Sequence, residues 1–286
     1  MRIQIVDAFT SRPFAGNPAG VCLLPAGPWP DDLWLGQIAA ELNHPETAFA
    51  LPLPAGGEAD WEIRWFTPLV EANLCGHATL ATVHTLHREG LLTDGPVRFL
   101  SRTSGPLTAW VEEGGSGGAD GSGGEITLDF PAAPGTEVPV PAGLADALGV
   151  LPEATFRTGA LGDLLAVLPD EATVRDLRPD LAAIAALSRR EELRGVIVTA
   201  AAAGAGTTYD FVSRFFAPAR GIPEDPVTGS AHTALAPYWA ARLGRTDALT
   251  GLQASARPGL VRAAVLGDRV RLTGRAVTVL EATLLV

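Results

Sequence analysis

Apolar and polar residues alternate over several short stretches of this chain, the pattern expected of strands with one buried face. The first such stretch is 2–9. A second is 61–65, with Trp61, Ile63 and Trp65 at the apolar positions. The same pattern predicts further strands at 97–100, 107–111, 126–130, near Val196, near Phe211 and on towards Val286. Residues 11–19 are rich in Gly, Pro and Asn and are predicted to form a loop.

Helical patterns are fewer and have clear end signals. One helix is predicted to begin at Asp31-Asp32 and to end before Pro45, because proline cannot continue a helix. Another is predicted from Gly76 to Gly90, a good terminating residue. Further helical segments are predicted near Leu144, Leu181 and Gly229. Strands mixed with these helices indicate an α+β fold.

The two halves of the chain share a motif order. The pentapeptide RWFTP at 64–68 matches RFFAP at 214–218, about 150 residues later. An acidic residue follows each, and then a Gly-X-Ala helix start at Gly76 and at Gly229. A repeat of half the chain length predicts two similar domains facing each other across a cleft.

The Pro- and Gly-rich segment 131–141 is a plausible crossing between these domains. We therefore expect an N-terminal domain at 1–130 and a C-terminal domain at 131–275, with a last strand at about 276–286 that can return to the first. The Gly/Ser-rich stretch 113–124 is predicted to be a long hairpin tip without chemistry.

Composition narrows the function. The formal net charge is −11, which disfavours nucleic acid as a partner because a phosphate backbone would be repelled. All 21 basic residues are Arg, so Schiff-base, pyridoxal-phosphate and P-loop chemistry, which need lysine, are excluded. No apolar run is long enough for a membrane span and no signal pattern is seen, so a soluble cytoplasmic protein is expected.

Metal chemistry is not expected from the sequence. Two cysteines are too few for a Cys-based zinc site or a disulfide framework. The five histidines show no zinc-binding spacing, and His84 and His87 are read as structural. We therefore predict no metal.

The two Gly-X-Ala helix starts are candidate anion sites. Unpaired backbone N–H groups and the helix dipole make such an end suitable for a carboxylate. Preorganised N–H donors also stabilise the negative charge that develops when a proton is removed beside a carboxylate. A small carboxylated substrate is therefore predicted at Gly76-His77 and Gly229-Ser230.

Glu46 is the candidate general base. It precedes the apolar run 47–51, so we expect it to be desolvated, with its pKa raised toward working pH. The alternative is a plain strand-end glutamate in water.

Each of the other candidate residues has a structural interpretation as well as a functional one. His77 can relay protons or hold a substrate oxygen, but a first-turn histidine also serves as a cap or faces solvent. Cys75 is either a small buried hydrophobe or a thiolate activated by the helix end. Asp225 and Ser230 also fit a turn residue and a helix cap.

Taken together, these stretches resemble the phenazine-biosynthesis PhzF-like family of the diaminopimelate epimerase-like superfamily. The matching motifs are VDAFT at 6–10, FAGNPAGV at 14–21, ETAF at 46–49, FTP at 66–68, Glu71, LCGHAT at 74–79 and EDPVTGSA at 224–231. They occur in order along nearly the whole chain, and the Gly/Ser insertion before Glu125 is the main irregularity.

The resemblance implies two similar domains, each a curled sheet around a central helix, with the active site in the cleft between them. It also implies a usually homodimeric, cofactor-free isomerase. The type activity converts trans-2,3-dihydro-3-hydroxyanthranilate into its ketone isomer. Membership of a broad family does not transfer the phenazine pathway to this protein.

The resemblance also assigns roles to residues. The family's proton-shuttling glutamate falls on Glu46, its histidine on His77, and its Asp and Ser on Asp225 and Ser230. On this basis Glu46, His77 and Asp225 are the expected catalytic residues. The expected substrate-binding residues are Asn17, Gly76, His77, Gly229 and Ser230.

Two other functions stay open. Epimerases of this superfamily use two cysteines, and here Cys75 matches the first while Asp225 stands at the second. A two-thiol racemase is thus disfavoured. An amino-acid epimerase that uses a mixed pair, with Cys75 as an alternative base, or Glu46 acting alone, stays open. A non-catalytic protein that binds small acids is the third possibility.

Overall fold

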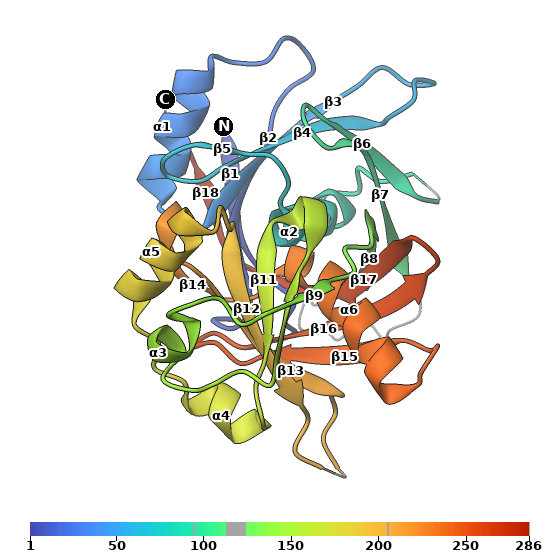
Figure 1. Ribbon diagram of the computed structural model, residues 1–286. Helices are drawn as coiled ribbons and strands as arrows, with labels where there is room; N and C mark the ends of the chain where they lie inside the picture. The colour runs from blue at the N-terminus through green and yellow to red at the C-terminus, as the bar shows by residue number, and fades with distance from the viewer. Residues whose placement is uncertain (94, 113–123, 205, 286) are drawn as a thin grey trace. The chain divides into compact units, whose positions relative to one another are not determined.

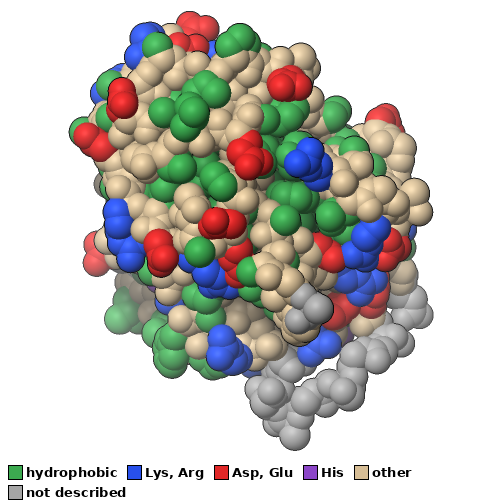
Figure 2. All heavy atoms as spheres, turned by 60° about the horizontal axis from the view of Figure 1, so that its bottom comes forward, with side chains coloured by type: hydrophobic (Ala, Val, Ile, Leu, Met, Phe, Trp, Pro, Cys, Tyr) green, Lys and Arg blue, Asp and Glu red, His purple; other side chains and the backbone are tan. Residues whose placement is uncertain are grey.

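The strands and helices fall into two units, which are described separately (Figure 1). The computed structural model describes residues 1–93, 95–112, 124–204 and 206–285. Unit 1 comprises 1–129 and 273–286, and unit 2 comprises 130–272. None of the described helices is both long and apolar enough to cross a membrane. On the face shown in Figure 2, the described Arg side chains are interspersed with Asp and Glu.

Unit 1 contains one mixed sheet. Its strands are β1 (Arg2–Ala8), β2 (Asn17–Leu23), β3 (Glu46–Pro52), β4 (Trp61–Phe66), β5 (Glu71–Ala72), β6 (Val97–Ser101), β7 (Gly105–Glu112), β8 (Glu125–Pro131) and β18 (Ala276–Thr283). β18 pairs with β1, and β1 with β2, both antiparallel. β2–β3 and β4–β6 are parallel pairs, whereas β3–β4, β6–β7 and β7–β8 are antiparallel.

The two helices of unit 1 use different faces of this sheet. Helix α1 (Asp32–Leu42) begins at Asp31, whose carboxylate accepts the Leu33 N–H, and ends at a left-handed residue. It packs in one core with strand residues such as Ile5, Phe49 and Phe66. Helix α2 (Gly76–Arg88) packs against β1, β2, β3, β7 and β18, and every residue from its start to position 86 is buried.

Unit 2 repeats this plan. Its strands are β9 (Thr136–Val138), β10 (Ala154–Arg157), β11 (Asp163–Val167), β12 (Gly195–Ala201), β13 (Phe211–Ala217), β14 (Ile222–Asp225), β15 (Leu249–Gln253) and β16 (Gly259–Leu266), and β17 (Arg269–Gly274) crosses into unit 1. β11–β12 and β13–β15 are parallel, and β12–β13 is antiparallel. The helices are α3 (Leu144–Leu148), α4 (Glu171–Asp176), α5 (Leu181–Arg190) and α6 (Gly229–Leu243).

Alternating residues of the unit 2 strands belong to two cores. Val196, Val198 and Phe216 pack with α3, α4 and α5. Ile197 and Phe215 pack with α6 on the other face. Because both faces of the strand are covered, β12 is apolar along most of its length.

The repeat predicted from the sequence is present in the contacts. Arg64 binds Glu71 through Nε and Nη2, both at 2.7 Å, and Arg214 binds Glu224 through the same atoms at 2.7 and 2.9 Å. Each guanidinium lies 5.0 Å from the ring two residues later, of Phe66 or Phe216. The two pentapeptides are therefore equivalent in structure.

Most predicted elements are found, with some corrections. The helices predicted at Asp31-Asp32, Gly76 and Gly229 are confirmed. The loop predicted at 11–19 ends earlier, because β2 begins at Asn17, and the crossing at 131–141 contains β9. Strand β11 and helix α4 were missed. The predicted hairpin tip concerns 113–124, of which 113–123 lie outside the described residues.

Candidate active site

Glu46 lies at the start of β3 and close to His77. Its side chain is 14% exposed, and Oε2 is 3.5 Å from His77 Nε2. The parallel pairing of β2 with β3 places Glu46 opposite Ala19, near the start of both strands. Glu46 is therefore largely removed from solvent, unlike a plain strand-end glutamate in water.

His77 is the second residue of α2 and is 4% exposed. Its Nδ1 lies 3.2 Å from Asn17 Nδ2 and 3.4 Å from Cys75 Sγ, while Nε2 faces Glu46. A solvent-facing role, one interpretation of the sequence, is wrong, because His77 and the whole first turn of α2 are buried. Four predicted site residues of unit 1 thus meet at one imidazole ring.

A glycine helps to position Asn17. Gly16 has φ +64°, and a Cβ there would lie 2.2 Å from the carbonyl oxygen of Ala8. Only glycine fits this backbone without displacement. The tight turn directs Asn17 into β2, where its side chain is fully buried.

The same group contains possible metal ligands. Among the described residues, Glu46, Cys75 and His77 offer ligand atoms that all lie within 4.8 Å of one another. Histidine spacing along the sequence could not reveal this group, since it forms only in three dimensions. However, Cys75 approaches Nδ1 and Glu46 approaches Nε2, so the two address opposite ring nitrogens. This arrangement fits a hydrogen-bonded relay better than one shared ion, and the absence of a metal stays a prediction.

Helices α2 and α6 begin in the same way. In both of these described helices the N-cap residue is extended and its side chain makes no capping hydrogen bond to the first turn. The first helical residue is glycine in each case, Gly76 and Gly229. The positive end of each helix dipole therefore lies at a turn without a side-chain cap.

Asp225 of unit 2 is tied to the start of α6. It lies at the end of β14, is 7% exposed, and its carboxylate accepts the Thr228 hydroxyl at 2.5 Å. The fully buried Gln253 donates to the Asp225 carbonyl and accepts the Thr228 N–H, both at 2.8 Å. Sequence reasoning missed Gln253, because nothing in its local sequence marks a partner 28 residues away.

Ser230, the second residue of α6, also has a partner that the sequence did not indicate. Arg194, just before β12, donates from Nη1 to Ser230 Oγ at 2.8 Å, and Arg194 is itself paired with Asp163. These two residues are 31 positions apart and meet through the parallel pairing of β11 with β12. Thus the structure adds two charged residues next to a predicted site residue.

Other buried titratable groups are structural. Burial lowers the pKa of His84 and of His232 to about 4, so both are neutral near pH 7. Burial also raises the pKa of Cys22 to about 12, which leaves this thiol protonated and unreactive. The expectation that His84 is structural agrees with its contact to Thr278.

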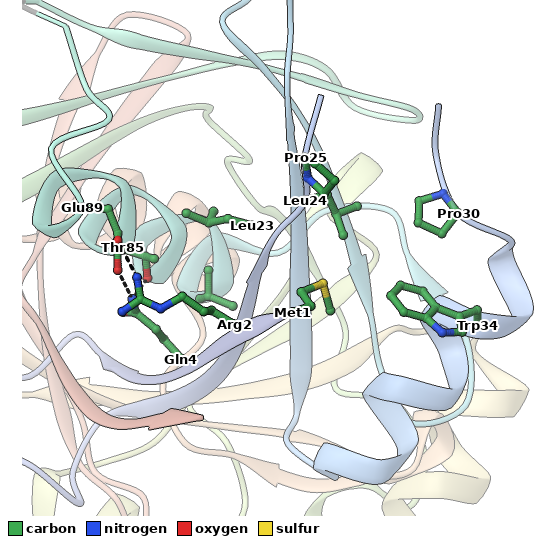
Figure 3. Close-up of a pocket in the computed structure, with 11 residues that line it drawn as sticks. Met1, Arg2, Gln4, Leu23, Leu24, Pro25, Pro30, Trp34, Thr85 and Glu89 are labelled. Atoms are coloured by element: carbon green, nitrogen blue, oxygen red, sulfur yellow. Dashed lines mark hydrogen bonds and ion pairs between the residues drawn. The ribbon is translucent and has the colours of Figure 1, made fainter. Parts of the chain in front are cut away.

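Unit 1 also contains a hollow of about 650 Å³ (Figure 3). Its wall is mostly apolar and includes Leu24 and Trp34, while Arg2 and Glu89 form an ion pair at 3.1 Å on one side. None of the predicted site residues lines it. The hollow is therefore not the predicted proton-transfer site.

Comparison with known proteins identifies the family. The sequence profile described as "Phenazine biosynthesis-like protein" matches residues 6–282. The chain belongs to this PhzF-like family. A relative named an uncharacterized isomerase, from Pseudomonas aeruginosa, is 47% identical over 96% of this chain and 94% of the relative. A PhzF family protein from Enterococcus faecalis has a crystal structure with a TM-score of 0.85, at 37% identity over 99% of each chain.

The PhzF-like fold is shared with racemases. A probable proline racemase from Agrobacterium radiobacter has a TM-score of 0.61 at 13% identity, over 99% of this chain and 92% of that chain. At this identity the similarity concerns the fold alone. The α+β, epimerase-like fold class predicted from the sequence is confirmed.

Proposed function

We propose that this PhzF-like isomerase moves a proton within a small carboxylated substrate and that Glu46 takes and returns the proton. One C–H bond breaks, another forms on a different carbon of the same molecule, and a double bond moves, so no oxidant or reductant is needed. The observation that carries the proposal is the Glu46–His77 contact of 3.5 Å in a largely buried environment. A single carboxylate can act first as base and then as acid.

The surroundings of His77 suit this role. With the Asn17 amide nitrogen as donor, Nδ1 accepts and the ring proton sits on Nε2, facing Glu46. An N–H group directed at a carboxylate stabilises its charged form. His77 therefore keeps Glu46 ready to accept a proton and can orient a polar group of the substrate.

The roles of the unit 2 residues are proposed from their match to the motifs of the PhzF-like family. Asp225 assists the transfer, and the backbone N–H groups at Gly229 and Ser230 bind a polar substrate group, as those at Gly76 and His77 do in unit 1. The uncapped starts of both helices support this assignment. The same pattern supports a homodimer that works without a cofactor.

The test uses trans-2,3-dihydro-3-hydroxyanthranilate as candidate substrate. Glu46→Gln should lower its isomerisation by about 10²–10⁴-fold, because this is the usual contribution of general acid–base catalysis. Its affinity for anthranilate, a non-reacting carboxylate, should stay within a few-fold of the wild-type value. Glu58→Gln, an exposed site in the same unit, is the matched control. Undiminished turnover in the Glu46 variant would refute the assignment.

A second candidate function, amino-acid epimerisation, is favoured by one observation. Cys75 Sγ lies 3.4 Å from His77 Nδ1, where a thiol could exchange a proton with the ring. Incubating amino acids with the enzyme in D₂O separates the alternatives. Deuteration at the α-carbon with loss of chirality supports epimerisation, and double-bond migration in the hydroxyanthranilate supports the isomerase. Binding of acids without either reaction would indicate a non-catalytic binding protein.

A further inference from the structure

The hydroxyl of Ser230 is held by a side chain from the neighbouring strand. Arg194 precedes β12, and its Nη1 donates to Ser230 Oγ at 2.8 Å. The N–H group occupies a lone pair of the serine oxygen. The hydroxyl proton must therefore point away from Arg194.

Arg194 itself is fixed from several sides. Its Nε and Nη2 bind the two carboxylate oxygens of Asp163 at 2.9 and 2.5 Å, and the Asp163 side chain is fully buried. The guanidinium also lies 5.1 Å from the ring centre of Phe215. A bidentate pair stacked on an aromatic ring restricts the arginine to one geometry.

The backbone explains why this pair forms here. Asp163 is the register partner of Gly195 in the parallel β11–β12 pair, so Arg194 is one residue away from it. A Cβ on Gly195 would lie 2.4 Å from the Phe215 ring. Glycine thus lets Phe215 pack tightly under the arginine.

The ionisation of Asp163 depends on its partner Arg194. Burial raises the pKa of Asp163, while Arg194 and the Gly195 N–H oppose that rise. Removing the guanidinium would leave a buried carboxyl without its counter-charge, and it would take up a proton. Asp163 therefore holds Arg194, and Arg194 favours the ionised form of Asp163.

We propose that Arg194 is a positioning residue that, clamped by Asp163, orients the Ser230 hydroxyl to donate to the substrate carboxylate. A preset donor binds better than a freely rotating one, because no rotor has to be ordered on binding. The guanidinium also polarises the hydroxyl and strengthens its hydrogen bond. This inference rests on the proposed function, in which Ser230 binds the substrate.

The test measures anthranilate binding by calorimetry. Arg194→Gln should weaken binding by about tenfold, the scale of one charge-assisted hydrogen bond. Arg194→Lys, which can still donate to Ser230, should recover part of the loss. Arg157→Gln is the matched control: it removes another arginine of unit 2 that binds a carboxylate, that of Glu191, at 2.6 Å. That control should leave anthranilate affinity unchanged.

A double-mutant cycle separates positioning from a general structural effect. If Arg194 acts through Ser230, then Arg194→Gln made in the Ser230→Ala background should change affinity by less than about twofold. An equal tenfold loss in both backgrounds would overturn the proposal, as would wild-type affinity of Arg194→Gln. Should Arg194→Gln fail to fold, Asp163→Asn/Arg194→Gln removes both charges together and must show the same loss.

The failure of this inference differs from a failure of the proposed function. If the wild-type protein neither binds anthranilate nor isomerises the hydroxyanthranilate, the proposed function fails and this inference fails with it. If the wild-type protein does both and Arg194→Gln binds anthranilate equally well, only the role of Arg194 is overturned.

Discussion

Units 1 and 2 each have a corner where a strand start meets a helix start, but the corner holds an acid in unit 1 and an arginine paired with Asp163 in unit 2. In unit 1 the corner joins Glu46 to His77 at 3.5 Å. In unit 2 it joins Arg194 to Ser230 at 2.8 Å. His77 and Ser230 follow the first glycine of their helices, so the helix positions correspond.

The strand positions are offset by one residue, because the counterpart of Glu46 is the residue after Arg194. Thr47 lies opposite Phe66 and Val196 lies opposite Phe216, which makes Glu46 the counterpart of Gly195. A side chain at Gly195 is excluded by the Phe215 ring, so unit 2 cannot place an acid there. The same backbone arrangement therefore carries different polar side chains in the two units. In the proposed function, unit 1 carries the group that exchanges a proton, and unit 2 carries the arginine that orients a donor.

The largest effect is expected from removing the contact between Glu46 and His77 in unit 1. His77→Asn should lower isomerisation of the hydroxyanthranilate by about 10²-fold, because it removes the imidazole nitrogen that faces Glu46. The Glu46→Gln/His77→Asn double variant should be no more than a few-fold slower than Glu46→Gln alone, since the two residues act as a unit. Initial rates of the four proteins measure this. Fully multiplicative losses would show that the residues act independently.

Arg64 and Arg214 are equivalent residues of the two repeats, so removing either should destabilise its own unit to a similar extent. Arg64→Met and Arg214→Met each remove the bidentate partner of a glutamate that is only about a quarter exposed, although Arg102 stays 3.5 Å from Glu71. Each should lower the free energy of unfolding by about 3 kcal/mol, the cost of breaking a buried ion pair. Urea unfolding measures both, and Arg98→Met, at an exposed pair with Asp60, is the control. A loss in only one unit would contradict the structural equivalence.

Acid should destabilise both units through one buried histidine in each. The pKa of His84 in unit 1 and of His232 in unit 2 is about 4, against 6.5 in the unfolded chain. Below pH 6.5 the unfolded chain binds protons that the folded chain does not. The unfolding free energy therefore falls from pH 6.5 towards 4, by about 3 kcal/mol per histidine, and is unaffected above 6.5.

Denaturant unfolding at several pH values checks this dependence. His84→Gln should reduce the loss between pH 6.5 and 4 by about 3 kcal/mol, measured from the variant's own stability at pH 7. A variant that keeps the wild-type slope would show that His84 does not contribute.

The smallest effect, a change in the free energy of unfolding, is expected at Gly195, the counterpart of Glu46. Gly195→Ala places a methyl group against the Phe215 ring and should cost about 1–3 kcal/mol. Gly36→Ala in α1, where a Cβ meets nothing within 4 Å, should instead stabilise by about 0.5–1 kcal/mol. Thermal unfolding compares the two. A neutral Gly195→Ala would mean that packing does not exclude a side chain there.

The sequence predicts this fold well where local signals carry it. The Asp31 cap and the glycines at 76 and 229 mark helix starts, and the repeated pentapeptides lie in equivalent strands. Strand β11 and helix α4 were missed because their segments are short and lack a clear period.

The candidate site could be predicted only in part. Motifs point to Glu46 and His77, but the burial of His77 depends on the sheet that surrounds α2. Asp163 and Arg194 lie in no motif and meet only through the register of two parallel strands. Contacts of this kind depend on tertiary structure, and no local pattern in the chain reports them.

The most direct test is a crystal structure of the Glu46→Gln variant with trans-2,3-dihydro-3-hydroxyanthranilate bound. Because this variant cannot exchange the proton, the substrate should remain unreacted. The account predicts that the side chain at position 46 lies about 3.5 Å from the carbon that loses its proton, with His77 beside it. Substrate found instead in the hollow lined by Leu24 and Trp34, away from position 46, would contradict the account (Figure 3).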